Sequence, residues 1–289
     1  MPKVVLVTLV WLALAACNDR PKSLFSEARR AMEADNYETA ARLYQELTIQ
    51  APGSPLAAEA HYELAQIYYL RLRDVDAAKD LLVKMLTDFP DSSVDIDARL
   101  LLARMYEEDL QDPQRAVKLY RALLAEDLDD NVRRQTLLEI AHCHYRMGEI
   151  DASADAYRRA LGLSYHRETD SAYMRLANLE WLGGSADESL RLLRELEERT
   201  SDDDYRHEAM LSEVEVLMSL GRFAAANERV SFAGDAFPES TDVVELKVRL
   251  HATELQHQSL DGEAEEALLQ ELQKKIRWGG GRRRGSPRQ

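Results

Sequence analysis

Residues 62–69 read YELAQIYY and residues 100–107 read LLLARMYE, with an alanine at the fourth position of each stretch. Four further stretches share this pattern: FSEARRAM at 25–32, LEIAHCHY at 138–145, MRLANLEW at 174–181 and LSEVEVLM at 211–218. The residues at the fourth position lie 36 to 38 residues apart and are Ala28, Ala65, Ala103, Ala141, Ala177 and Val214. Self-similarity at a near-constant period of this length indicates a repeat architecture.

A second set of positions recurs downstream in every copy. Small residues follow the first set by about twelve positions, which is the length of a short helix and a turn. They are Ala40, Ala78, Ala116, Ser153, Ser189 and Ala226. A large apolar residue stands four positions later, at Tyr44, Leu82, Tyr120, Tyr157, Leu193 and Val230. Positions four apart lie on one face of a helix, so this half of each copy is also predicted to be helical.

These positions resemble the tetratricopeptide repeat, a helix-turn-helix unit of about 34 residues. The resemblance implies an all-α fold, a right-handed solenoid of about six repeats over residues 17–240. In that family the small residues let the two helices of a repeat approach closely, and the large residues fill the groove between repeats. We expect capping helices over 241–277 and a disordered basic tail over 278–289. Repeats two and three depart from the others by one extra turn residue, near Leu72 and Leu110.

The composition agrees with a helical protein and argues against several functions. The 289 residues include only 12 Gly and 8 Pro, too few for the turns of an all-β sandwich or barrel. The net charge of −15 argues against nucleic-acid binding by the body of the chain. Motifs for phosphate loops, dinucleotide binding, zinc proteases and nucleophile elbows are absent. We therefore predict a protein that is not an enzyme and that has no cofactor.

His142, Cys143 and His144 invite a metal-site interpretation, but their spacing argues against it. Side chains two positions apart on a helix point about 200° away from each other, so the two histidines cannot grip one ion. Cys143 stands where the repeat needs a small buried side chain. We therefore predict a structural role for this segment and no metal site.

The first twenty residues resemble the export signal of a bacterial lipoprotein. Lys3 precedes an apolar run over residues 4–14, which is too short to span a bilayer and fits the core of a signal peptide. The sequence LAAC at 14–17 resembles the lipobox, which implies removal of residues 1–16 and acylation of Cys17, for example with palmitate. Asn18 after the cysteine favours the outer membrane, on its periplasmic side. The alternative is a plain signal peptide that happens to end in cysteine.

The resemblance also predicts a partner-binding groove. In tetratricopeptide arrays the first helices line the concave surface, and here a polar column would run between aromatic and apolar columns. Aromatic side chains act as anchors for an extended or helical peptide, and polar ones supply hydrogen bonds. The alternative is an ordinary solenoid lining without a ligand. The predicted groove residues are Tyr62, Gln66, Tyr69, Arg104, His142, Tyr145, Asn178 and Trp181.

Together these features predict a lipid-anchored scaffold that binds other envelope proteins or peptides. The repeats are similar to those of BamD-type barrel-assembly lipoproteins, of the Tol-Pal coordination protein and of pilotin lipoproteins. That similarity implies a role in barrel assembly, in secretin or pilus assembly, or in Tol-Pal-type coordination. One alternative is a self-associating structural lipoprotein, in which an acidic face binds the basic segment 274–289, with its seven Lys and Arg and no acid. Another is a non-catalytic accessory of polysaccharide export or cell-wall machinery.

Overall fold

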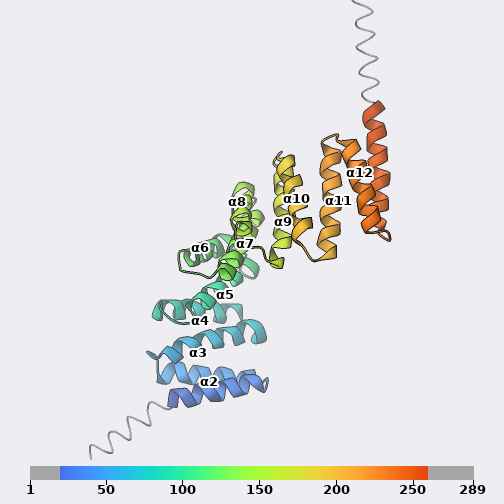
Figure 1. The fold of residues 1–289 in the computed structure, drawn as a ribbon. Coiled ribbons are helices and arrows are strands. Elements are labelled where there is room, and N and C mark those ends of the chain that lie inside the picture. The colour runs from blue at the N-terminus through green and yellow to red at the C-terminus, as the bar shows by residue number, and fades with distance from the viewer. Residues whose placement is uncertain (1–19, 260–289) are drawn as a thin grey trace, which may run out of the picture. The chain divides into compact units, whose positions relative to one another are not determined.

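The chain divides into two compact units, Met1–Leu163 and Ser164–Gln289. The structure is a computed structural model that describes residues 20–259, and within them every regular element is a helix (Figure 1). The predicted all-α class is therefore confirmed. Among residues 20–259, no helix has the length and apolar character needed to cross a membrane. The predicted signal peptide, Cys17, the capping segment beyond residue 259 and the basic tail lie outside the described residues.

In the unit Met1–Leu163, first and second helices of the repeats alternate along the chain. The first helices are residues 20–33, α3 (Pro55–Gln66) continued by the π-helix η1 (Ile67–Leu72), α5 (Asp95–Glu108) and α7 (Asp130–Arg146). The second helices are α2 (Tyr37–Gln50), α4 (Val75–Asp88), α6 (Pro113–Leu123) and α8 (Ile150–Leu161). From α2 to α8, each α-helix packs against the next one along the chain.

The unit Ser164–Gln289 continues the alternation. It contains the short 3-10 helix η2 (Arg167–Thr169), the first helices α9 (Asp170–Leu182) and α11 (Asp203–Ser219), and the second helices α10 (Ala186–Arg199) and α12 (Phe223–Ala236). α9 packs against both α10 and α11, so the first helices of adjacent repeats contact each other here. A further helix covers residues 241–259 and buries Val243, Leu246 and Leu250.

The small residues identified in the sequence lie where the two helices of each repeat meet. All twelve are at most 1% exposed. In the fourth repeat the hydroxyl of Ser153 donates a hydrogen bond to the carbonyl oxygen of Ala141 at 2.8 Å, which joins the two small positions directly. Close-packed interiors have no spare room, so a larger side chain at these positions would push the helices apart.

The large residues of the second helices are buried in the core. The six residues at this position, from Tyr44 to Val230, are at most 3% exposed. Tyr44 packs edge-on against the ring of Phe25, with ring centroids 5.5 Å apart. Burying one such side chain contributes about 1.5–3 kcal/mol, so this column is a main source of stability for the array.

Every turn between the two helices of a repeat contains one residue with positive φ. In repeats four to six this residue is Gly148, Gly184 or Gly221, and in repeats one to three it is Asp35, Arg73 or Gln111. The left-handed region disfavours residues that carry a Cβ atom. In repeats one to three the next residue is Asn36, Asp74 or Asp112, whose side chain accepts a hydrogen bond from a backbone N–H of the following helix. These caps offset part of the strain of the non-glycine turns.

In repeats two and three, the backbone hydrogen bond that closes the turn spans one residue more, which accommodates the extra turn residue. The backbone N–H of Asp74 donates to the carbonyl oxygen of Tyr68, six residues back, at 2.9 Å. The corresponding N–H of Glu149 in repeat four reaches only five residues back, to His144. In repeat two the wider closure coincides with η1, because a π-helix holds one more residue per turn than an α-helix.

Arg73 offers a direct test of this turn geometry, because its side chain is exposed and its φ is +56°. We expect Arg73→Gly to raise the free energy of unfolding by about 0.5–1 kcal/mol relative to Arg73→Ala, since only glycine relieves the left-handed strain. Urea unfolding of both variants measures the difference. An Arg73→Gly variant less stable than Arg73→Ala would contradict the assigned conformation.

Candidate functional site

The predicted groove residues divide between the two units, and each group is described within its own unit. All of them lie on first helices or on η1. Asn178 and Trp181 belong to Ser164–Gln289. The other six belong to Met1–Leu163 and are Tyr62, Gln66, Tyr69, Arg104, His142 and Tyr145.

Tyr62, Gln66 and Tyr69 follow one another along α3 and η1. Tyr62 and Gln66 are half-buried and hydrogen-bonded to each other, and burial raises the pKa of Tyr62. Tyr69 is only 8% exposed, and its hydroxyl donates to Oδ2 of Asp109 at 2.8 Å. Burial, followed by this hydrogen bond, raises the pKa of Tyr69 to about 12. Tyr69 therefore joins η1 to the end of α5 and exposes little of its ring.

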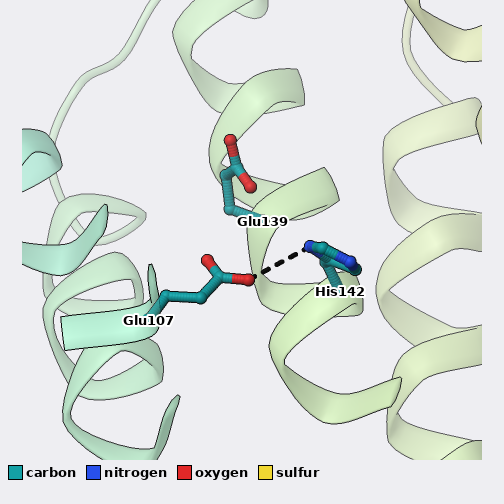
Figure 2. A group of neighbouring side chains, drawn as sticks. All are labelled: Glu107, Glu139 and His142. Carbon is teal, nitrogen blue, oxygen red and sulfur yellow. Dashed lines mark ion pairs between the residues drawn. The ribbon is translucent and has the colours of Figure 1, made fainter. Parts of the chain in front are cut away.

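A cluster of two carboxylates and one imidazole lies between α5 and α7 (Figure 2). Glu107 comes from the end of α5, and Glu139 and His142 come from successive turns of α7. Oε1 of Glu107 lies 3.1 Å from Nδ1 of His142. One ligand atom of each of the three residues lies within 4.8 Å of the others. We call these three residues the Glu107 cluster.

The members of the Glu107 cluster differ in exposure. The Glu107 side chain is 4% exposed, whereas that of His142 is 44% exposed, so the cluster opens to solvent on the histidine side. Arg146 stands beside it: its guanidinium donates to the backbone carbonyl of Glu107 and to Oε1 of Gln111, both at 2.9 Å. It comes within 3.8 Å of Oε1 of Glu107. Arg146 thereby ties the end of α5 to the end of α7.

The pKa values of the two glutamates shift in opposite directions. Burial by itself would raise the pKa of Glu107, but hydrogen bonds from His142 and Cys143 and the charges of His142 and Arg146 outweigh it, and the pKa is lowered. Burial raises the pKa of Glu139, and the negative charge of Glu107 raises it further. The guanidinium of Arg104 partly offsets the rise at Glu139. Oppositely shifted neighbouring groups are frequent in functional sites, although structural ion networks also produce them.

The His142-Cys143-His144 segment behaves as predicted in one respect and differently in another. Cys143 is fully buried, and burial raises the pKa of its thiol. His144 is buried against Glu149 and Arg121, so the two histidines have separate partners. However, His142 lies close to two glutamates, Glu107 and Glu139. The sequence pattern does not predict this group, because Glu107 comes from another helix. The i, i+3 spacing of Glu139 and His142 on α7 was the available indication.

Tyr145 ends the polar face of α7. Tyr145 is 44% exposed, whereas Tyr62 is half-buried and Tyr69 is only 8% exposed. A solvent-exposed aromatic ring beside charged side chains is a common anchor at protein interfaces. It stays a prediction that Tyr145 contacts a partner.

In the unit Ser164–Gln289, Asn178 and Trp181 line a common hollow of about 310 Å³ formed by α9, α10 and α11. Nε1 of Trp181 donates to Oγ of Ser219 at 3.0 Å, which holds the indole against α11. Asn178 is exposed. The remaining lining combines apolar and charged side chains and includes Met174, Val216, Arg175, Glu208 and Glu215. Binding sites combine apolar surface with placed polar groups, and both are present here.

Comparison with family models identifies the repeats. A tetratricopeptide-repeat model matches residues 25–93 and 138–204, and a second such model matches residues 100–155. A search of curated protein sequences finds no match.

Solved structures of the same fold have little sequence identity to the chain. PilF of Pseudomonas aeruginosa is 12% identical, with a TM-score of 0.53 over 81% of this chain and 99% of that one. The C-terminal part of a repeat-containing protein from Cytophaga hutchinsonii is 13% identical, with a TM-score of 0.57 over 78% of this chain and 80% of that one. A chain in the structure of Naa15/Naa10 bound to HypK-THB is 17% identical, with a TM-score of 0.55 over 87% of this chain and 36% of that one. At these identities the likeness concerns the fold alone.

Proposed function

This chain belongs to the tetratricopeptide-repeat family, and we propose that it is a non-catalytic scaffold that binds segments of other proteins on the exposed faces of its first helices. The observation that carries this proposal is the hollow at Asn178 and Trp181, where apolar and charged side chains line a space of about 310 Å³. This volume is near the lower end of the range for ligand pockets and suits one or two side chains of a bound peptide.

The exposed side chains favour a peptide over a small metabolite. In Ser164–Gln289, Trp181 supplies aromatic surface, and Asn178, Arg175 and Glu215 supply hydrogen-bonding groups around it. In Met1–Leu163, Tyr145 supplies exposed aromatic surface. This combination of anchors and polar groups suits a segment of protein chain. One of the similar structures is itself a protein complex, that of Naa15/Naa10 bound to HypK-THB, which supports a protein partner.

We further propose that the scaffold works in the bacterial envelope, anchored to the periplasmic side of the outer membrane through acyl chains on Cys17. The support is the sequence pattern of residues 1–18, with its lipobox-like LAAC and the following Asn18. Several acyl chains on one residue give stable anchoring, whereas a single chain binds membranes only marginally. Its partners would then be other envelope proteins involved in barrel, secretin or pilus assembly, or in Tol-Pal-type coordination.

The groove proposal predicts that Tyr145→Asp combined with Trp181→Asp abolishes partner binding. In a complex, each new carboxylate would be buried against the partner surface that contacts the aromatic ring in the wild type. Burying an unpaired charge is costly, so complexes should be lost although the repeats stay folded. The measurement is cross-linking of the full-length chain in its native cells, with mass spectrometry of the captured proteins and circular dichroism of the purified variant.

The matched control places the same kind of change on second helices. Val83 on α4 and Phe232 on α12 are 44% and 52% exposed, so Val83→Asp with Phe232→Asp also replaces exposed apolar side chains by carboxylates. This control should retain the captured partners. Equal capture by the groove variant and the wild type, at unchanged helicity, would refute binding through the first helices.

The anchor proposal predicts that Cys17→Ala moves the protein from the membrane fraction to the soluble fraction. The variant lacks the thiol that receives the lipid, so the chain loses its proposed attachment. Fractionation of cells, together with metabolic labelling by a palmitate analogue, measures this. Cys143→Ala is the matched control and should remain membrane-bound and labelled. Labelling of Cys17→Ala at the wild-type level would contradict the proposal.

A further inference from the structure

The Glu107 cluster plays no part in the proposed anchor and shares no residue with the hollow at Trp181. We propose that Glu107, Glu139 and His142 bind a divalent transition-metal ion such as Zn²⁺. Within residues 20–259, these residues form a group of three metal-ligating side chains whose ligand atoms all lie within 4.8 Å of one another. Imidazole and carboxylate groups together suit Zn²⁺ and neighbouring transition metals.

The distances fit a mononuclear site. Zn²⁺ binds imidazole nitrogen and carboxylate oxygen at about 2.0–2.2 Å, so two of its tetrahedral ligands stand about 3.4 Å apart. Oε1 of Glu107 and Nδ1 of His142 are 3.1 Å apart, close to this spacing. Glu139 is half-buried, and one of its carboxylate oxygens lies within 4.8 Å of the ligand atoms of the other two residues. The three side chains therefore need little rearrangement to converge on one ion.

The helices supply the ligands in a pattern suited to metal binding. Glu139 and His142 form a Glu-x-x-His pair on one face of α7, and Glu107 reaches across from α5 (Figure 2). In helical bundles with carboxylate metal centres, the same i, i+3 pair and a glutamate from a facing helix project towards the metal. The packed core positions beside the ligands, Ala141 and Cys143, are fully buried, so α7 holds its two ligands on a rigid element.

The two carboxylates of the cluster favour a bound cation. Two carboxylates close together repel each other, and a divalent ion between them removes that repulsion. Two guanidinium groups already lie near these carboxylates, that of Arg104 near Glu139 and that of Arg146 near Glu107. Arg146 also donates to the backbone carbonyl of Glu107 and to Gln111. Arg146 can keep these two partners when the ion takes the Glu107 carboxylate.

The site is open to solvent, because the His142 side chain is 44% exposed. Three protein ligands leave the fourth tetrahedral position to a water molecule, as in zinc sites that exchange ligands.

The test is Zn²⁺ binding to the tag-free full-length chain, followed by calorimetry and thermal unfolding. We expect one Zn²⁺ per chain and a higher melting temperature in its presence. Glu139→Gln and His142→Gln keep the size of the side chain and each remove one ligand. Both should weaken binding by about 100-fold or more, since loss of outer-sphere partners alone costs 10–100-fold. Because Glu139 and His142 are partly exposed, both variants should keep the fold.

His166→Gln is the matched control. His166 is an exposed histidine 3.6 Å from a carboxylate oxygen of Glu168, without a second glutamate in the group. Its replacement should leave Zn²⁺ affinity and the thermal shift unchanged. The proposal is overturned if the wild-type chain binds no Zn²⁺, or if Glu139→Gln and His142→Gln bind it as tightly as the wild type. The second result would place the ion elsewhere, for example at Cys17.

Discussion

The close approach of two helices at a pair of small residues is the contact on which the rest of the structure depends. The hydrogen bond from Ser153 to the carbonyl oxygen of Ala141 shows how little space this contact leaves. With the helices this close, the large residues of the second helices, such as Tyr120, reach the core and become fully buried. The same contact determines which side of each first helix faces away from its own partner helix.

Function depends on that outward face of the first helices. Ala103 and Ala141 are buried against the second helices, and the residues that follow them, Arg104 and His142, lie partly exposed. Polar and aromatic side chains can occupy these positions without disturbing the core, because the seam between helices already supplies the packing. His142 of the Glu107 cluster and Asn178 at the hollow occupy such positions on first helices.

The sequence predicts the fold well because the deciding residues are local and periodic. The small residues at Ala65 and Ala78, and their equivalents, identify both helices of each repeat without knowledge of distant contacts. The turns are less predictable, since Arg73 and Gln111 adopt the left-handed conformation at a position where repeats four to six have glycine. Residue propensities do not predict a left-handed Arg or Gln. In both turns the next residue, Asp74 or Asp112, caps the following helix, and this hydrogen bond offsets part of the strain.

The candidate sites are less predictable from sequence than the fold, because they depend on contacts between helices. The alignment of repeats placed Asn178 with Trp181, and the structure brings them to one hollow. It also included Tyr69, whose hydroxyl in fact bonds to Asp109 and whose ring is mostly covered. The Glu107 cluster depends on the rotation of α5 relative to α7, and on side-chain rotamers, neither of which the repeat spacing specifies. The sequence sets His142 beside His144, two positions apart, whereas the structure brings His142 to Glu107 and Glu139.

The most direct test of the helix-pairing account is the free energy of unfolding of Ala103→Leu, measured in urea against Ala122→Leu. Ala103 is fully buried where α5 meets α6, and Ala122 is exposed on α6 of the same repeat. The account predicts a loss of about 1–3 kcal/mol for Ala103→Leu, because the added side chain forces the helices apart. The control should stay within about 0.5 kcal/mol of the wild type. Equal stability of the two variants would contradict the central role of the small-residue contact.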